Sequence, residues 1–270
     1  MGEWVNAGTN LQNLSKGIQR QQIIPDIGEE FCHVDLWAAE AFLVALDAQE
    51  PFLIDMLYKG IKPYNWLSEE LEKKFPEHVI KYDYSYKDSK QSIHLFNYGG
   101  HASKAAKESG LPLFMAEWMY NFYHGTCPGI KRRMKEIEEA VTNTRTLVSP
   151  LGRRRFFLAP LSDKLLQQAY AWKSQSCIGE ITNIALGKLY WKGRVGDTTP
   201  GLTWLFPAMN THDGMAIRCR LGEREVVKKM VMDAFNIPLE VKGLKIKIPV
   251  EIGWGKNFND VKNKEICFYE

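Results

Sequence analysis

The segment Phe31-Cys32-His33-Val34-Asp35 runs directly into Leu36-Trp37-Ala38-Ala39-Glu40-Ala41. The first five residues are mostly apolar and end in a carboxylate, whereas the residues that follow, up to Ala45, are rich in strong helix formers. We predict a short strand that ends at Asp35 and a helix after it. Asp35 would then be either a ligand at a strand end or, as an alternative, the N-cap of the helix.

A second strand signal surrounds the dipeptide Asp213-Gly214, which separates an apolar run at 205–209 from the stretch 215–219. Such a dipeptide between two strands predicts a β-hairpin. If the strands that carry Asp35 and Asp213 are neighbours, the two carboxylates could share divalent cations of the kind that clamp a phosphoryl transfer. The alternative is that Asp213 serves only the turn, because Asp-Gly is favoured there.

The remaining pattern is mostly helical, with breaks at Gly and Pro. We expect helices over residues 69–75, 88–98, 103–109, 114–124, 130–144, about 163–191 and about 223–235. A basic turn occupies residues 149–155. Residues 244–254 alternate between apolar and polar positions, which predicts an antiparallel strand with Pro249 at an edge or a bulge. The predicted fold class is α+β: an antiparallel sheet built from early and late strands, with a helical middle.

The composition limits the function without identifying it. The chain has 270 residues with 45% hydrophobic residues, enough for one or two globular domains, and its formal net charge of +3 names no anionic partner. Its five scattered cysteines contain no Cys-x-x-Cys pair, which argues against a disulfide framework and a zinc ribbon. We therefore expect a reducing, cytoplasmic location, and a soluble chain without a targeting or membrane segment.

Three residues with complementary chemistry recur at a spacing of four: Lys90, His94 and Tyr98. On a helix this spacing places them on one face, where they offer a cation, an imidazole and a ring. A nucleoside triphosphate would use charge for its phosphates and a flat surface for its sugar and base. The alternative is a solvated helix face with one packed tyrosine.

Seven segments in order resemble the palm and fingers of family A DNA polymerases, the group of bacterial DNA polymerase I and its phage relatives. They are 8–14, 35–40, 90–99, 146–155, 171–176, 210–214 and 249–258. One such segment would be weak, but seven in the right order are hard to obtain by chance. Two positions depart from the family pattern. The family commonly has an acidic residue directly after the aspartate that corresponds to Asp213, whereas this chain has Gly214. His94 stands where many relatives carry Phe or Tyr.

The resemblance implies a role for particular residues. Asp35 and Asp213 would bind two Mg²⁺ ions, with the backbone carbonyl of Leu36 as a further ligand, and Lys90 would complete the catalytic set. The nucleotide-binding residues would be Glu40, Lys87, Lys90, His94 and Tyr98, with Glu40 excluding the ribose 2′-hydroxyl. The DNA-binding residues would be Asn10, Gln12, Arg153, Arg154, Arg155, Gln175 and His212.

The same resemblance implies a domain plan and an activity. Residues 1–46 and 172–270 would form the palm and residues 47–171 the fingers, with thumb and exonuclease domains absent. The activity would be template-directed DNA synthesis, transferring a nucleotide from dNTP to a primer 3′-hydroxyl on a DNA primer-template. A phage origin would place it in the host cytoplasm.

Two other functions remain open from the sequence. The chain could be part of a split or truncated polymerase that binds primer-template or a partner chain with the thumb and exonuclease, and is inactive alone. It could also be a phosphohydrolase that uses the same two metals, although that reading leaves Lys90, His94 and Tyr98 without a role.

Overall fold

The computed structural model describes residues 17–82, 84, 86–194, 206–211 and 213–269. The chain forms two compact units: unit 1 comprises residues 1–39, 175–239 and 245–270, and unit 2 comprises residues 40–174 and 240–244. One long helix, α10 (Asp163–Arg194), contributes residues to both. Among the described residues, no helix has the length and apolar character needed to cross a membrane.

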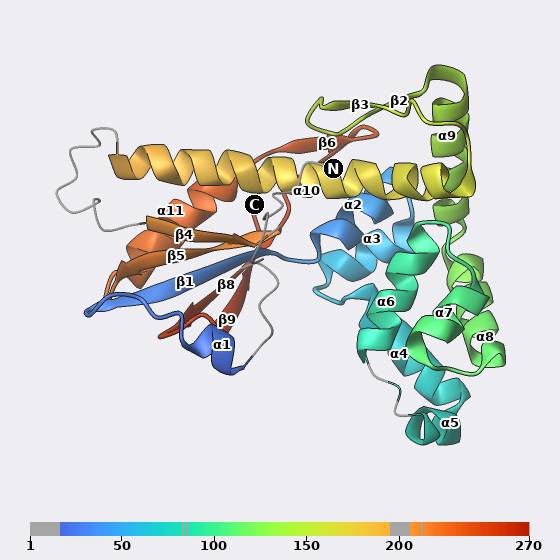
Figure 1. Ribbon diagram of the computed structural model, residues 1–270, viewed down its shortest axis with the longest axis horizontal. Helices are drawn as coiled ribbons and strands as arrows, with labels where there is room; N and C mark the ends of the chain where they lie inside the picture. Colours follow the sequence, from blue (N-terminus) through green and yellow to red (C-terminus); the bar gives the residue numbers. More distant parts are fainter. Residues whose placement is uncertain (1–16, 83, 85, 195–205, 212, 270) are drawn as a thin grey trace. The chain divides into compact units, whose positions relative to one another are not determined.

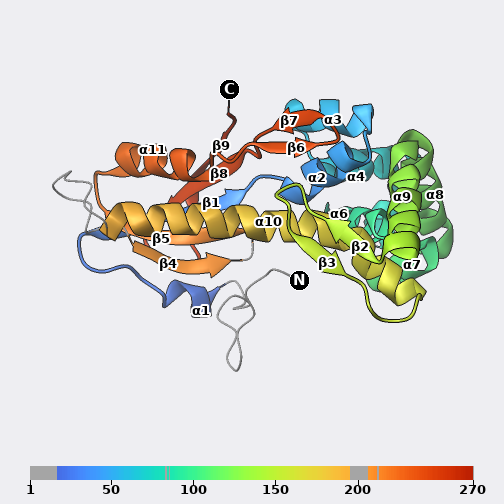
Figure 2. The same cartoon turned by 90° about the horizontal axis from the view of Figure 1, so that it is seen from above.

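Unit 1 is built on a five-stranded antiparallel sheet in the order β4-β5-β1-β8-β9 (Figure 1). Its strands are β1 (Glu29–Leu36), β4 (Phe206–Thr211), β5 (Gly214–Arg220), β8 (Val250–Gly255) and β9 (Lys262–Cys267). The short helix α1 (Ile18–Gln21) precedes the sheet in the chain, and α11 (Arg224–Phe235) packs against β1 and β8 (Figure 2). The central strand β1 therefore pairs only with strands that come much later in the sequence.

The two faces of β1 have different characters. Cys32, Val34 and Leu36 are at most 4% exposed, whereas His33 and Asp35 between them are partly buried. Successive side chains of a strand point to opposite faces, so the first three residues face the packed side of the sheet. His33 and Asp35 share the other face.

Unit 2 is mostly helical, and prolines start several of its helices. They are α2 (Ala39–Asp47), α3 (Pro51–Tyr58), α4 (Pro63–Lys74), α5 (Pro76–Lys81), α6 (Tyr86–Asn97), α7 (Ala102–Ser109), α8 (Leu113–Thr126) and α9 (Pro128–Thr144). Pro51, Pro63, Pro76 and Pro128 each occupy a first helical position, where the missing N–H has no intrahelical partner to lose. The sequence thus sets where these helices begin.

Two small hairpins complete the architecture. The first, in unit 2, joins β2 (Thr146–Val148) to β3 (Arg154–Phe156), and the second joins β6 (Leu239–Val241) to β7 (Leu244–Ile246). A core cluster of unit 2 lies next to the first hairpin and contains Val141, Leu147, Phe157 and Trp172 among its buried members.

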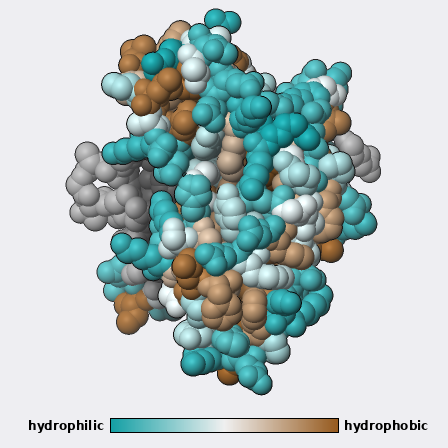
Figure 3. All heavy atoms as spheres, turned by 90° about the vertical axis from the view of Figure 1, so that its right-hand side faces the viewer, coloured by the Kyte–Doolittle hydropathy of each residue, from teal (hydrophilic) through white to brown (hydrophobic). Residues whose placement is uncertain are grey.

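The surface in Figure 3 mixes hydrophilic side chains with scattered hydrophobic ones. In unit 2 the exposed large hydrophobics include Ile80, Leu113 and Phe114. Scattered apolar side chains are normal on a protein surface, so they do not by themselves indicate a partner.

The structure confirms the predicted α+β class with its antiparallel sheet, the strand at Asp35, the hairpin after residue 205 and the long helix from Asp163. Several details of the prediction were wrong. The predicted basic turn over 149–155 is the connection of the β2–β3 hairpin, with its last two residues in β3, whereas α5, β6 and β9 were not predicted. The expected strand over 244–254 is two strands. Pro249 lies between them, and β8 is an inner strand, so Pro249 marks no sheet edge.

Candidate polymerase site

The two predicted metal-binding aspartates lie at the ends of neighbouring strands. In the β1–β5 ladder Asp35 is directly opposite Gly214, the residue after Asp213. The backbone N–H of Leu36 donates to the carbonyl of Asp213 at 2.9 Å, and the N–H of Trp37 donates to Pro249 at 2.8 Å. The predicted proximity of the two aspartates along the sheet is confirmed.

The structure contradicts the N-cap explanation of Asp35 and changes the turn expected at Asp213. Asp35 lies inside β1, and α2 begins only at Ala39, so Asp35 is not the N-cap of that helix. Gly214 already belongs to β5 and pairs with Thr211, so Asp213-Gly214 is not the two-residue loop of the hairpin. The expected Asp-Gly turn is therefore wrong, but Asp213 itself does lie in the turn before β5.

Gly214 is required by a close approach to Asp35. A Cβ at position 214 would overlap the carbonyl oxygen of Val34 and the Oδ1 atom of Asp35. The carboxylate of Asp35 thus lies over the glycine, in space that any side chain would need.

The donor set is compatible with a divalent cation that retains several water molecules. Asp35 is partly buried and Asp213 is exposed, and both supply hard carboxylate oxygens. Within the part of the chain that the structure describes, no group of three or more His, Cys, Asp or Glu residues could enclose a metal ion. Mg²⁺ suits such a sparse site, because it commonly binds through one or two carboxylates plus water and substrate phosphates.

In unit 2, three of the predicted nucleotide-binding residues meet around one carboxylate. The Tyr98 hydroxyl donates to Oε1 of Glu40, and Nδ1 of His94 lies 3.0 Å from Oε2 of the same side chain. Both oxygens of Glu40 are therefore engaged. Burial, and then the nearby charge of Glu40, raise the pKa of Tyr98 well above its usual value, so the phenol stays protonated as a donor.

Ser174 also contacts this cluster, with its Oγ 3.0 Å from the Tyr98 hydroxyl. We call the four residues Glu40, His94, Tyr98 and Ser174 the Glu40 group. It was not predicted from the sequence, because a serine inside a helix carries no signal of its own. Tyr98 follows α6, which ends at Asn97, instead of lying on the helix as predicted. From this position its hydroxyl contacts both Glu40 and Ser174.

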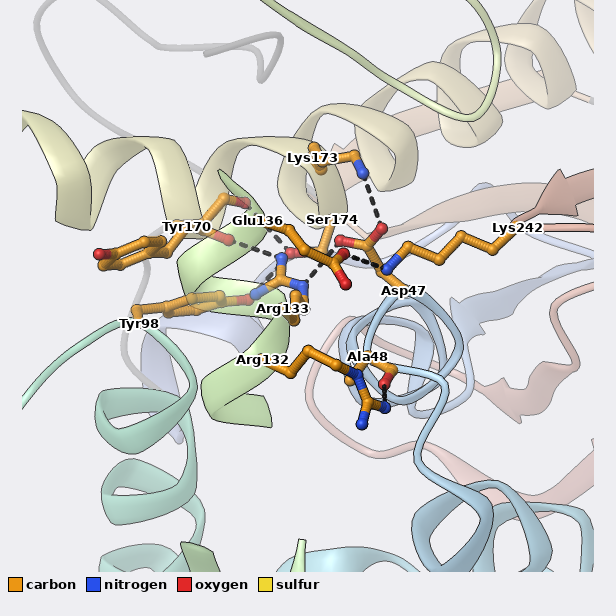
Figure 4. A network of polar contacts seen from close by, with 11 residues as sticks. Asp47, Ala48, Tyr98, Arg132, Arg133, Glu136, Tyr170, Lys173, Ser174 and Lys242 are labelled. Atoms are coloured by element: carbon orange, nitrogen blue, oxygen red, sulfur yellow. Dashed lines mark hydrogen bonds and ion pairs between the residues drawn. The ribbon is translucent and has the colours of Figure 1, made fainter. Parts of the chain in front are cut away.

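A buried ionic network supports this part of unit 2 (Figure 4). The Arg133 side chain, 1% exposed, donates through Nε to Asp47 at 2.8 Å and through Nη2 to the carbonyl of Tyr170 at 2.8 Å. Lys173 donates to the other oxygen of Asp47 at 2.7 Å. Burial alone would raise the pKa of Asp47, but Arg133 and Lys173 outweigh it and hold that pKa below its usual value. The network joins α2, α9 and α10 next to the Glu40 group.

The other predicted site residues are more dispersed. Lys87 and Lys90 are exposed on α6, and the Lys90 ammonium lies 5.9 Å from the ring centroid of Tyr64. The structure does not bring Lys90 into the Glu40 group. The α6 face is nevertheless not simply solvated, since His94 is engaged with Glu40.

The predicted DNA-binding residues lie in several places. Arg153 and Arg154 are exposed on the β2–β3 hairpin, while Arg155 stacks over Phe157 at 4.7 Å from its ring centroid. Gln175 is partly buried on α10. Asn10, Gln12 and His212 lie outside the described residues.

Solved structures give the fold class. The chain matches 131 chains of known structure, among them the POL domain of Pol1 from M. smegmatis in complex with DNA primer-template and dNTP. The match has a TM-score of 0.76 at 17% sequence identity, and it covers 93% of this chain but 44% of that one. The fold is that of a polymerase domain, of which this chain spans less than half the length. No curated protein matches the chain.

The sequence gives the family. The family model described as DNA polymerase family A matches residues 5–260. Because that match covers nearly the whole chain, the protein belongs to DNA polymerase family A. The resemblance found in the sequence is confirmed at this level.

Proposed function

We propose that the protein is a DNA-directed DNA polymerase that extends a DNA primer by transferring nucleotides from dNTP. The observation that carries the proposal is the Asp35–Asp213 arrangement, with two carboxylates held at the ends of paired strands in a family A fold. Electrostatic stabilisation and positioning provide almost all the catalysis of phosphoryl transfer, so two anchored carboxylates are the essential protein groups.

Asp35, Asp213 and the carbonyl of Leu36 would hold two Mg²⁺ ions. When bound, such ions supply Lewis acidity for the primer 3′-hydroxyl and neutralise charge on the reacting phosphate. Lys90 and Lys87 would neutralise the leaving phosphates, as exposed cations on α6 can do. The other site residues would position the incoming nucleotide and the primer-template.

The Glu40 group would read the sugar of the incoming nucleotide. Both oxygens of the Glu40 carboxylate are held by partners, so the side chain has a fixed position. A side chain in a fixed position distinguishes the 2′-hydrogen of a deoxyribose from the 2′-hydroxyl of a ribose better than a mobile one does. Arg153, Arg154, Arg155, Gln175 and His212, with Asn10 and Gln12, would contact primer-template.

The palm would comprise residues 1–46 and 172–270 and the fingers residues 47–171. This assignment is supported by the division into units, whose boundaries at 39/40 and 174/175 lie close by. We also propose a phage-type polymerase that acts in the cytoplasm of the host.

The test is primer extension on a recessed DNA template with Mg²⁺ and four dNTPs. The full chain is compared with Asp35→Asn, Asp213→Asn and, as a matched control, Glu225→Gln at an exposed carboxylate of α11. We expect extension to fall by at least about a thousandfold in both Asp variants and to persist in the control. Extension at the parental rate by either Asp variant would overturn the assignment.

A second candidate is a polymerase part that needs a partner chain. It is compatible with the comparison, in which this chain covers 44% of the matched POL-domain chain. In that case neither the parent nor the control extends the primer alone, and binding to primer-template is weak and falls steeply with salt. Restoration of extension by a chain that supplies thumb and exonuclease domains would identify this case.

A further inference from the structure

The strand β9 lies beyond the residues that the family model matches, which end at 260. It pairs with β8 and carries Lys264 in the middle of its length. The family match therefore does not include this side chain.

The strand register places a third carboxylate beside Asp35. Glu251 on β8 is the direct partner of Asp35 in the β1–β8 ladder. Directly opposed residues of an antiparallel pair project from the same face of the sheet, and like charges in that arrangement repel each other. Because Gly214 is the partner of Asp35 on the other side, Glu251 is the carboxylate next to it across the ladder.

Lys264 neutralises this added charge. Its ammonium forms an ion pair with Oε1 of Glu251, whose side chain is 19% exposed. The pKa of Lys264 is raised above its usual value: burial lowers it, but Glu251 and then Asp35 outweigh that effect. The cation therefore lies within the electrostatic field of both carboxylates.

Gly253 makes room for this cation. A Cβ at position 253 would meet the Cγ1 atom of Val261 at 2.4 Å and the Cγ atom of Lys264 at 3.1 Å, so the side chains of both residues pass over β8 where there is no side chain. A β-bulge between Ile252 and Trp254 shifts the register of β9 at the same place. The local backbone is thus arranged to send Lys264 onto the Asp35 face.

We propose that Lys264 is a positioning residue that neutralises Glu251 and thereby sets how strongly the Asp35 face of the sheet attracts divalent cations. This inference rests on the proposed function, because it assumes that Asp35 is a cation ligand. Glu251 strengthens the negative field at the site and Lys264 weakens it. The balance of the pair leaves the site able to bind a cation without adding a fixed third ligand.

The test measures binding of Mn²⁺ alone to the full chain by electron paramagnetic resonance. Removing the cation in Lys264→Met should tighten Mn²⁺ binding by about three- to tenfold, because Glu251 is then unneutralised. Glu251→Gln should weaken binding by a similar factor, and the double variant should return to within about twofold of the parent. Methionine keeps the apolar stem over Gly253, and glutamine keeps the shape of the glutamate.

The matched control is the pair Lys228–Glu265, at 2.7 Å, which joins the same strand to α11. Adjacent strand residues alternate in face, so Glu265 projects away from the face of Lys264. We expect Lys228→Met and Glu265→Gln to change Mn²⁺ binding by less than about twofold. Single variants of Lys264 and Glu251 that shift binding in the same direction, or by no more than these controls, would overturn the proposal.

An Asp35→Asn arm separates the two levels of inference. If this variant loses Mn²⁺ binding while the Lys264 and Glu251 variants behave like the controls, only the positioning role fails. If Asp35→Asn binds Mn²⁺ as tightly as the parent, the assignment of Asp35 in the proposed function fails, and this inference fails with it.

Discussion

Leu36 and Asp213 are joined by a backbone hydrogen bond of 2.9 Å, which fastens the loop that carries one candidate ligand to the strand that carries the other. Together with the β1–β5 ladder, this bond sets the relative position of the two backbone segments that carry the aspartates. Substitutions that keep the backbone unchanged should therefore alter the chemistry of the site without moving it.

Gly214→Ala should disrupt this arrangement. The added Cβ would overlap the carbonyl of Val34 and the carboxylate of Asp35, so the paired strands have to separate. We expect a loss of about 1–3 kcal/mol in the free energy of unfolding, measured with urea, and a large loss of primer extension. The control is Gly187→Ala in α10, where a Cβ meets no atom within 4 Å and stability should not fall. Equal behaviour of the two variants would contradict the steric argument.

Tyr98→Phe should weaken sugar selection by the proposed polymerase. The change removes the donor to Glu40 and frees one carboxylate oxygen. A hydrogen bond to a charged group contributes about 1.5–3 kcal/mol, so we expect at least about a tenfold loss of preference for deoxyribonucleotides over ribonucleotides in competitive incorporation. Tyr123→Phe is the matched control, because it removes a buried hydroxyl that donates to Asn97 at 2.7 Å. A similar loss of preference in both variants would show that general destabilisation is the cause.

Arg133→Met should lower the free energy of unfolding of unit 2 by more than the change in side-chain size alone would. It leaves the buried carboxylate of Asp47 with only Lys173 as a partner. Removing one member of a buried ion pair costs about 3–5 kcal/mol, which urea unfolding can measure. Lys59→Met breaks an exposed pair with Asp55, both side chains being more than 60% exposed, and should cost less than about 0.5 kcal/mol. A small loss for Arg133→Met would mean that the network is not held as described.

His124 should make unit 2 sensitive to acid. Burial, followed by the charge of Lys131, lowers the pKa of this histidine to about 4, and its side chain lies among aromatic rings of α8 and α6. The unfolded chain takes up a proton near pH 6.5 and the folded chain only near pH 4, so stability is lost as the pH falls through this window. This contribution amounts to about 2 kcal/mol between pH 7.5 and pH 5.

The measurement is urea unfolding of the parent and His124→Phe at both pH values. The variant should lose about 2 kcal/mol less than the parent on acidification, because phenylalanine cannot take up the proton. Carboxylate titration is common to both proteins and cancels in the comparison. Identical losses would show that His124 does not control the acid response.

Elements whose residues show a clear local pattern could be predicted from the sequence. β1 was predictable because apolar residues lead to a polar end, and the positions of the helix starts are set by prolines such as Pro63 and Pro128. β9 was not predicted because five of its six residues are exposed and it shows no alternation. Its strand character comes from pairing with β8, which only the tertiary structure supplies.

In the candidate site, too, features of the local sequence could be predicted, whereas contacts between distant residues could not. The aspartates could be predicted because each stands at a strand end, a feature of the local sequence. The engagement of Glu40 by both His94 and Tyr98 could not, since it joins residues that are 54 and 58 positions apart. Ser174, at 76 positions from Tyr98, has no local pattern that would connect the two.

The order of strands in unit 1 has a consequence for synthesis on the ribosome. β1 ends at Leu36, but its two neighbours, β5 and β8, begin only at Gly214 and Val250. Almost all of unit 2 has been translated before the first of these neighbours exists. The central strand, with Asp35 on it, therefore cannot form its pairing with β5 until Gly214–Arg220 has been translated, and the two aspartates can come together only after that point.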